Sequence, residues 1–143
     1  MRTVEAHAAL TAGPDRVWEC IADPTRWNEW LVLHKSWKGQ PPGAAVEGLS
    51  ATAAATAMNM PITIDWTFEK VDVPHRLVMG GTTRAGVKLR LTITLTGRDT
   101  GTLVDVNANV DGGMIDGPMG AVFKKSLTSA LDKSLKKLDT VAR

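Results

Sequence analysis

The residues of this chain that could do chemistry are few and scattered. There are three histidines, His7, His34 and His75, and a single cysteine, Cys20. The histidines lack the spacing of a metal site, so each is expected at the surface or in a turn. His34 follows a tryptophan-rich segment and is the one that could lie near a cavity mouth. Cys20 falls on an expected amphipathic helix without a recognisable base beside it, so nucleophilic catalysis is not indicated.

An acidic pattern from Asp105 to Asp111 imitates the start of a calcium-binding loop, with Asp or Asn at every second position. The sixth position is Val110 rather than the glycine that the sharp turn of such a loop needs. The twelfth is Asp116, which is too short to replace the bidentate Glu. Alternation with valines predicts a strand instead. We expect no metal site and no cofactor.

Glycines at 112–117 and lysines at 124–137 could suggest binding of phosphate or nucleic acid. The glycines lack the spacing of a phosphate-binding loop, and neighbouring aspartates would repel an anion. Asp132 and Asp139 interrupt the lysines, which are expected to form a solvated helix face. With a formal net charge of +2, the chain is not expected to bind nucleic acid.

Large apolar side chains are the strongest candidates for a binding site. The chain has five tryptophans, six methionines and no tyrosine, and such side chains suit an irregular core or a ligand cavity. Ordinary core packing is the alternative for each of them. Asp65, Asn59, His34 and Thr82 could supply orienting polar groups, although the strand position of Asp65 points it outward. The expected ligand-binding residues are Trp37, Met58, Met60, Ile64, Trp66, Met79, Arg84, Leu91, Met114, Met119 and Phe123.

The elements that must position these residues follow from the spacing of apolar side chains. Alternation predicts strands at 3–10, 62–71, 87–96 and 103–110. Further strands are expected at 31–37, 45–57 and 76–82, although the alanines of 45–57 would favour a helix. Residues 14–22 and 25–30 read as two short helices, each near a proline.

The segment 116–141 has apolar residues at the spacing of one helix face. Asp116 is a plausible N-cap, with Pro118 in the first turn. About 24 helical residues would span roughly 36 Å. Successive strands with short connections form an antiparallel meander, and only this helix is long and apolar enough to cover its open face. The expected fold class is α+β, with a curved sheet around the helix and a cavity between them.

Length and composition agree with one domain over residues 1–143. A single cysteine excludes an internal disulfide and fits a reducing compartment. The first residues lack the apolar core of a signal peptide, and no stretch is apolar enough to span a bilayer. We therefore expect a cytoplasmic protein without stable membrane insertion, and leave open whether it is a monomer or a dimer.

Two segments, GPDRVWECIADPTRWNEW and GPMGAVFKKSLTSALDKSLKKL, together with this order of elements, resemble the START-like superfamily. It includes the Bet v 1-like proteins and the polyketide cyclase/dehydrase (SRPBCC) family. The pattern P-x-x-V-W…D-P-x-x-W-x-x-W is typical of its two short helices. The resemblance covers essentially the whole chain and is strongest for short actinobacterial members. It implies the helix-grip fold, in which a seven-stranded antiparallel sheet surrounds the C-terminal helix and encloses a hydrophobic tunnel.

The resemblance also implies a set of functions. Family members bind lipids, sterols, polyketides or hormones, a minority are enzymes, and some of the short members are toxins of toxin–antitoxin pairs. We favour binding of a hydrophobic or amphipathic small molecule in the cavity. A cyclase, dehydratase or hydrolase in the same cavity would need a buried, pKa-shifted group beside it. A toxin or stress-type interaction protein, with a small antitoxin-like partner, would have a solid core and an exposed apolar patch.

Overall fold

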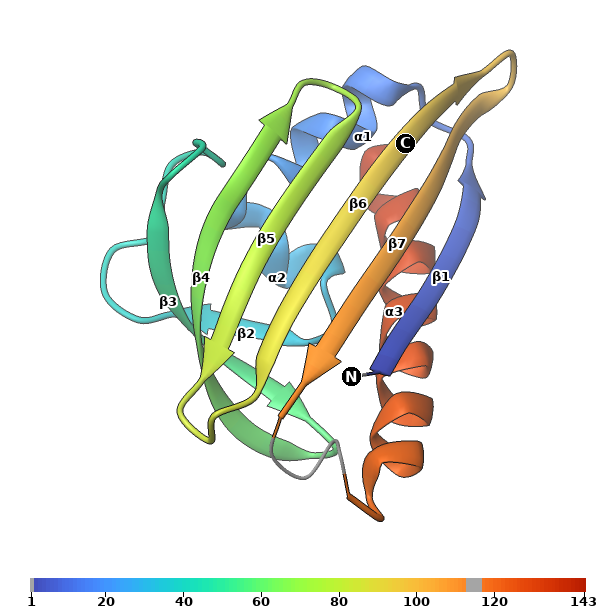
Figure 1. Cartoon of the computed structure of the whole chain (residues 1–143). Helices are drawn as coiled ribbons and strands as arrows, with labels where there is room; N and C mark the ends of the chain where they lie inside the picture. The colour runs from blue at the N-terminus through green and yellow to red at the C-terminus, as the bar shows by residue number, and fades with distance from the viewer. Residues whose placement is uncertain (1, 113–116) are drawn as a thin grey trace.

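A seven-stranded antiparallel sheet curves around one long C-terminal helix, as Figure 1 shows. The computed structural model describes residues 2–112 and 117–143. This is the helix-grip architecture expected from the sequence. The elements, in chain order, are β1 (Arg2–Leu10), α1 (Pro14–Ile21), the 3-10 helix η1 (Pro24–Arg26), α2 (Trp27–Trp30), β2 (His34–Trp37), β3 (Ser50–Ala57), β4 (Met60–Asp72), β5 (Arg76–Thr83), β6 (Lys88–Arg98), β7 (Gly101–Asp111) and α3 (Gly120–Ala142).

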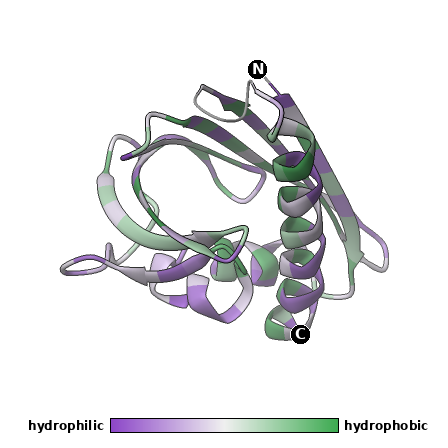
Figure 2. Cartoon of the chain, turned by 90° about the horizontal axis from the view of Figure 1, so that it is seen from below, coloured by the Kyte–Doolittle hydropathy of each residue, from purple (hydrophilic) through white to green (hydrophobic). Residues whose placement is uncertain are grey.

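The strands follow the order β1-β7-β6-β5-β4-β3-β2, so β2 to β7 form an uninterrupted meander. β1 pairs with β7 and places the start of the chain at the sheet edge nearest α3. Seen from below in Figure 2, the sheet bends away from α3 and returns toward it through β2 and the short helices. This curvature leaves one concave face, and α3 lies along only part of it.

Alternation along the strands determines which side chains enter the core. In β4, Ile64, Trp66 and Phe68 are buried, whereas Asp65 and Glu69, which point to the other face, are exposed. The helix α3 turns one leucine stripe toward the sheet, and Figure 2 shows apolar and polar bands alternating along it. Burial of each such side chain contributes about 1.5–3 kcal/mol. The buried leucines of α3 are Leu127, Leu131, Leu135 and Leu138.

The first turn of the C-terminal helix differs from the prediction. Asp116, the expected N-cap, lies outside the described residues, and Pro118 belongs to a turn that precedes α3. The helix begins at Gly120 with Met119 as its N-cap, which supplies no side-chain cap. The prediction of an earlier start was wrong because Met119 and Val122 continue the apolar spacing while being 44% and 51% exposed. At the N-terminal end of α3, the apolar face of the helix continues beyond the part that the sheet covers.

Two strands are also shorter than predicted. β2 starts at His34, because the chain after α2 makes a turn in which the His34 amide donates to the Leu31 carbonyl at 3.0 Å. β3 starts at Ser50 rather than at residue 45. Residues before it form a loop that is held by a 2.8 Å bond from the Ala45 amide to the Ala22 carbonyl. The loop therefore packs against the short helices instead of extending the sheet.

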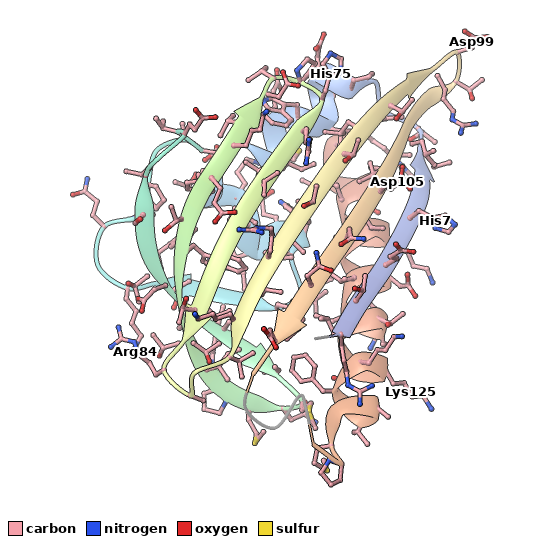
Figure 3. All side chains as sticks on the ribbon, viewed as in Figure 1. His7, His75, Arg84, Asp99, Asp105 and Lys125 are labelled. Atoms are coloured by element: carbon pink, nitrogen blue, oxygen red, sulfur yellow. The ribbon has the colours of Figure 1, made fainter. Side chains whose placement is uncertain are left out.

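Within residues 2–112 and 117–143, no helix combines the length and apolar character needed to cross a bilayer. The same residues contain no group of His, Cys, Asp and Glu side chains that could hold a metal ion. The acidic pattern from Asp105 to Asp111 lies in β7, where Asp105 is exposed and points away from the sheet (Figure 3).

Candidate ligand-binding site

An apolar cavity of about 110 Å³ lies between the sheet and the first turns of α3. It is at the lower end of the molecule in Figure 1, where the β3–β4 and β5–β6 turns approach the start of the helix. β4 contributes Ile64, and α3 contributes Phe123 and Leu127. The side chains that close the cavity at the end of the molecule include Met58, Met60, Ala85 and Val87.

The cavity reaches the surface beside the β3–β4 turn. Met60, one of its lining residues, is 47% exposed. Leu33, Ala57 and Met58 also line an outer groove of about 270 Å³, whose other wall is the polar side of α3 around Ser129. These shared residues separate the cavity from the groove, so their movement would widen an opening. Methionine side chains are suited to this because they are unbranched and flexible.

The β3–β4 turn itself has an unusual backbone. Met58 and Asn59 both adopt positive φ values, 54° and 62°, between the paired residues Ala57 and Met60. Two central residues with positive φ form the type I′ turn that matches the twist of a hairpin. Such turns normally use Asn and Gly, and a bulky residue at this φ is uncommon. The sequence therefore places a cavity-lining methionine where a less bulky residue would suit the turn better.

A second, inner pocket of about 20 Å³ continues the cavity toward the middle of the sheet. Leu33, Ile64, Leu89 and Leu127 line both spaces, so the two are adjacent. The inner pocket adds Trp66 and Leu91 from the sheet, and His34 from β2. Together the two spaces extend from Met60 at the surface to Trp66 and Leu91 inside, and His34 lies on the wall of the inner pocket.

His34 is the only titratable residue among the described residues that line either space. It is 9% exposed, and burial lowers the pKa of its imidazole below the ordinary value. The ring is therefore neutral at pH 7. The imidazole makes no hydrogen bond to any described residue. Every fully enclosed side-chain nitrogen of the described residues has a hydrogen-bond partner, so the unpaired nitrogens of His34 keep some accessible surface. These two facts fit an imidazole edge that faces the inner pocket.

Tryptophan rings hold His34 in place. The ring of Trp27 stands edge-on to His34 at 5.8 Å, and that of Trp37 lies 4.9 Å from it, measured between ring centroids. Trp27 is itself fixed by a 2.9 Å hydrogen bond from its indole N–H to the Ile21 carbonyl. The Trp37 indole N–H donates to the Pro24 carbonyl at 2.8 Å. The short helices thus serve as a support for the histidine.

The segment that leads to His34 is also tied to α3. Ser134 is buried on the helix, and its hydroxyl donates to the Ala130 carbonyl at 2.8 Å. The same oxygen accepts the Val32 amide at 2.9 Å. This link sets the distance between α3 and residues 32–34, which form one wall of the cavity and of the groove.

Six of the expected binding residues line the two spaces, four lie elsewhere, and Met114 is not among the described residues. Met79 is buried in the core of the sheet, and Met119 is exposed at the N-cap of α3. Trp37 is half-buried beside His34, and Met114 lies outside the described residues. Arg84 points away from the molecule in Figure 3 and pairs with Asp65 at 3.4 Å. The six lining residues are Met58, Met60, Ile64, Trp66, Leu91 and Phe123.

The sequence reasoning missed several lining residues. Val87 and Leu89 share a strand face with Leu91, so alternation in the predicted strand could have found them. Leu127 lies one turn of helix beyond Phe123 and could have been found in the same way. The burial of His34 had only a weak signal, the nearby tryptophans. His7 and His75 are exposed as expected and point outward in Figure 3.

Cys20 is buried on α1, away from both spaces. Burial raises the pKa of its thiol, which keeps it protonated at pH 7. Its carbonyl accepts the Trp30 indole N–H at 3.2 Å. Cys20 is therefore a packing residue of the short helices, as its position on an amphipathic helix predicts.

Comparisons with known proteins agree with the helix-grip fold described above. The model of the family described as "Polyketide cyclase / dehydrase and lipid transport" matches residues 1–143. The chain belongs to this family. Its fold is shared by protein CV1439 from Chromobacterium violaceum, whose crystal structure gives a TM-score of 0.75 at 19% identity, over 99% of this chain and 98% of that one. The START-like resemblance seen in the sequence is thus confirmed.

Relatives of this polyketide cyclase/dehydrase family member occur in Mycobacterium tuberculosis. The uncharacterized protein Rv1546 is 29% identical over 136 residues, which cover 95% of each chain. The protein named Toxin Rv0910 is 27% identical over 128 residues, which cover 90% of this chain and 89% of the relative. These matches support the resemblance to short actinobacterial family members that the sequence indicated.

Proposed function

We propose that the protein binds a small hydrophobic or amphipathic molecule in the cavity between the sheet and α3. The observation that carries the proposal is the apolar lining of a space that reaches the surface at Met60. Among the described lining residues, the polar groups are limited to the hydroxyl of Thr83, the indole N–H of Trp66 and the imidazole of His34. Apolar burial, with a few polar groups to orient the ligand, is typical of small-molecule sites.

The size of the cavity limits the ligand. Its 110 Å³ is below the range of about 300–1,000 Å³ that is usual for ligand pockets. An apolar cavity of about 150 Å³ can hold benzene, so a single ring or a short chain is the natural scale here. A longer molecule would have to extend past Met58 and Met60 into the outer groove, where Ser129 and Lys133 could meet a polar end.

The proposal is tested by native mass spectrometry of protein purified from its own host, paired with a denatured run and extraction of small molecules. An added mass that is lost on denaturation would support the proposal and identify the ligand class. A second arm titrates the purified protein with toluene in a calorimeter. An unliganded mass, together with no heat from toluene, would rule the proposal out.

An enzyme in the same cavity is the second candidate, and one observation favours it. His34 is a buried group with a lowered pKa beside a pocket, as a catalytic site would require. As a neutral imidazole it could accept a proton from a ligand. However, none of the other described lining residues is titratable, so His34 would act without a second acid or base. Turnover of a bound polyketide-like compound, lost in His34→Gln, would establish the enzyme.

A toxin role is a third candidate, since a relative at 27% identity is named a toxin. It predicts that expression of the chain arrests growth of its host and that a small neighbouring protein relieves the arrest. Normal growth at high expression would exclude this role. Ligand binding and toxicity are separable, because a variant with a blocked cavity should lose the first and keep the second if the surface alone acts.

A further inference from the structure

We infer that His34 hydrogen-bonds the polar group of the ligand, and that this ligand is an uncharged, ring-sized molecule with a hydroxyl group, such as a phenol. The inference rests on the proposed function and specifies its ligand class. It assigns a binding role to a residue whose sequence context indicated a position in a turn or at the surface.

The position of His34 supports this role. The residue lines the inner pocket and is nine-tenths buried. Trp27 and Trp37 pack against its ring. No described residue accepts or donates a hydrogen bond to the imidazole. A ligand that enters the inner pocket would therefore lie next to this ring.

An unpaired polar group beside a bound hydrocarbon would be costly. Leaving a buried donor or acceptor without a partner costs about 1–3 kcal/mol, so a ligand with its own polar group next to His34 is favoured. Neutral imidazole has one donor and one acceptor nitrogen. A hydroxyl matches it because it can both donate and accept. The indole N–H of Trp66, whose side chain lines the same pocket, also has no acceptor among the described residues.

The charge of the lining argues against an anionic ligand. None of the described residues of the cavity or inner pocket is cationic, whereas Lys133 lines the outer groove. A carboxylate next to His34 would lose its hydration without gaining a paired charge. The hydroxyl of Thr83 is not a competing anchor, because it lines the outer cavity and already accepts the Val87 amide at 3.1 Å.

The experiment measures binding of phenol, toluene and benzoate by calorimetry at pH 7.5, to the wild type and to two variants. His34→Phe keeps an aromatic ring between the tryptophans but removes both nitrogens. His34→Gln retains a donor and an acceptor. Because toluene leaves water more readily than phenol, the informative quantity is the change in the ratio of their Kd values between proteins.

His34→Phe should raise the Kd of phenol about two- to tenfold relative to that of toluene, which corresponds to one hydrogen bond. His34→Gln should restore most of the loss, and benzoate should bind weakest to the wild type. If His34→Phe changed the Kd values of phenol and toluene equally, or changed neither, the inference about His34 would be overturned. Toluene binding to the wild type would still support the proposed function. Tightest binding by benzoate would overturn the ligand class. Failure of the wild type to bind either neutral probe would refute the proposed function and this inference together.

A second measurement does not depend on the variants folding. Nitrogen NMR of the wild type resolves the ring nitrogens of His34 and reports their hydrogen bonding. Phenol should shift these nitrogen signals, and toluene should leave them near their unliganded positions. Identical spectra with the two ligands would contradict direct contact.

Discussion

Substitution of Leu127 by phenylalanine tests whether the space between sheet and helix is empty. Leu127 lines both the cavity and the inner pocket, so a larger side chain there would enter the passage between them. An empty cavity of about 110 Å³ costs up to about 2.6 kcal/mol, at roughly 24 cal/mol per Å³. Filling about a quarter of it should therefore recover roughly 0.6 kcal/mol. In a close-packed core the same change would instead cost about 1–3 kcal/mol.

The assay is urea unfolding followed by far-ultraviolet circular dichroism, in the absence of ligand. We expect Leu127→Phe to leave the free energy of unfolding unchanged or slightly higher. The matched control is Leu135→Phe, two turns further along the same helix face at a buried position outside both spaces. The control should lose about 1–3 kcal/mol through overpacking. A different sign of the change in unfolding free energy would distinguish a void at Leu127 from the close-packed core at Leu135.

Binding provides the second half of the test. In Leu127→Phe the Kd of toluene should rise at least tenfold, whereas Leu135→Phe, if it remains folded, should keep the affinity of the wild type. Two equally destabilised variants would refute the reasoning, because they would show that the space at Leu127 is already filled. So would full toluene affinity in Leu127→Phe, since the ligand would then lie elsewhere.

Three further predictions concern the supports of the site. Because burial lowers the pKa of His34 in the folded state, the unfolded chain takes up this proton first, and the wild-type unfolding free energy should fall from about pH 6.5 toward pH 5. His34→Phe should lack that decrease, and parallel pH profiles would contradict it. Ser134→Ala should cost about 1–3 kcal/mol, because the Val32 amide loses its acceptor; equal stability of Ser134→Ala and wild type in urea would contradict this link. In Gly81→Ala the new Cβ would lie 2.9 Å from the Trp66 ring, so about 1–3 kcal/mol should be lost. Gly43→Ala, which meets no atom within 4 Å, should stay within about 0.5 kcal/mol, and thermal unfolding that ranked the two glycines alike would refute the packing argument.

Most of the fold could be predicted because apolar and polar side chains alternate along the strands. In residues 88–96 every second side chain is apolar, and the structure turns those side chains inward. Such alternation is a local signal that does not depend on distant contacts. The start of α3 could not be predicted in the same way, since the apolar residues Met119 and Val122 have no sheet to pack against. Periodicity reports a possible face, but not whether a partner covers it.

The candidate site was only partly predictable for a related reason. Alternation along the strands places residues such as Ile64 and Leu91 on the inner face of the sheet. It does not distinguish a residue that lines a cavity from one in the packed core. Met79, for example, is buried in the core and lines neither space. Arg84 was expected in the site as a polar group that could orient a ligand, yet it is exposed and pairs with Asp65 on the outer face. The burial of His34 depends partly on Trp27, which comes from α2 and meets it only in the folded chain, whereas Trp37 lies three residues further along β2.

The ring cluster around His34 also gives the protein a built-in optical signal. The chain has five tryptophans and no tyrosine, so indole rings dominate its near-ultraviolet emission. Trp27 contacts both Trp37 and Trp66, with ring centroids 5.2 and 6.4 Å apart, and its edge meets His34. A molecule that reaches the inner pocket must therefore alter the surroundings of coupled chromophores. Occupancy of the site can be followed by fluorescence in unlabelled protein, at concentrations far below those needed for calorimetry.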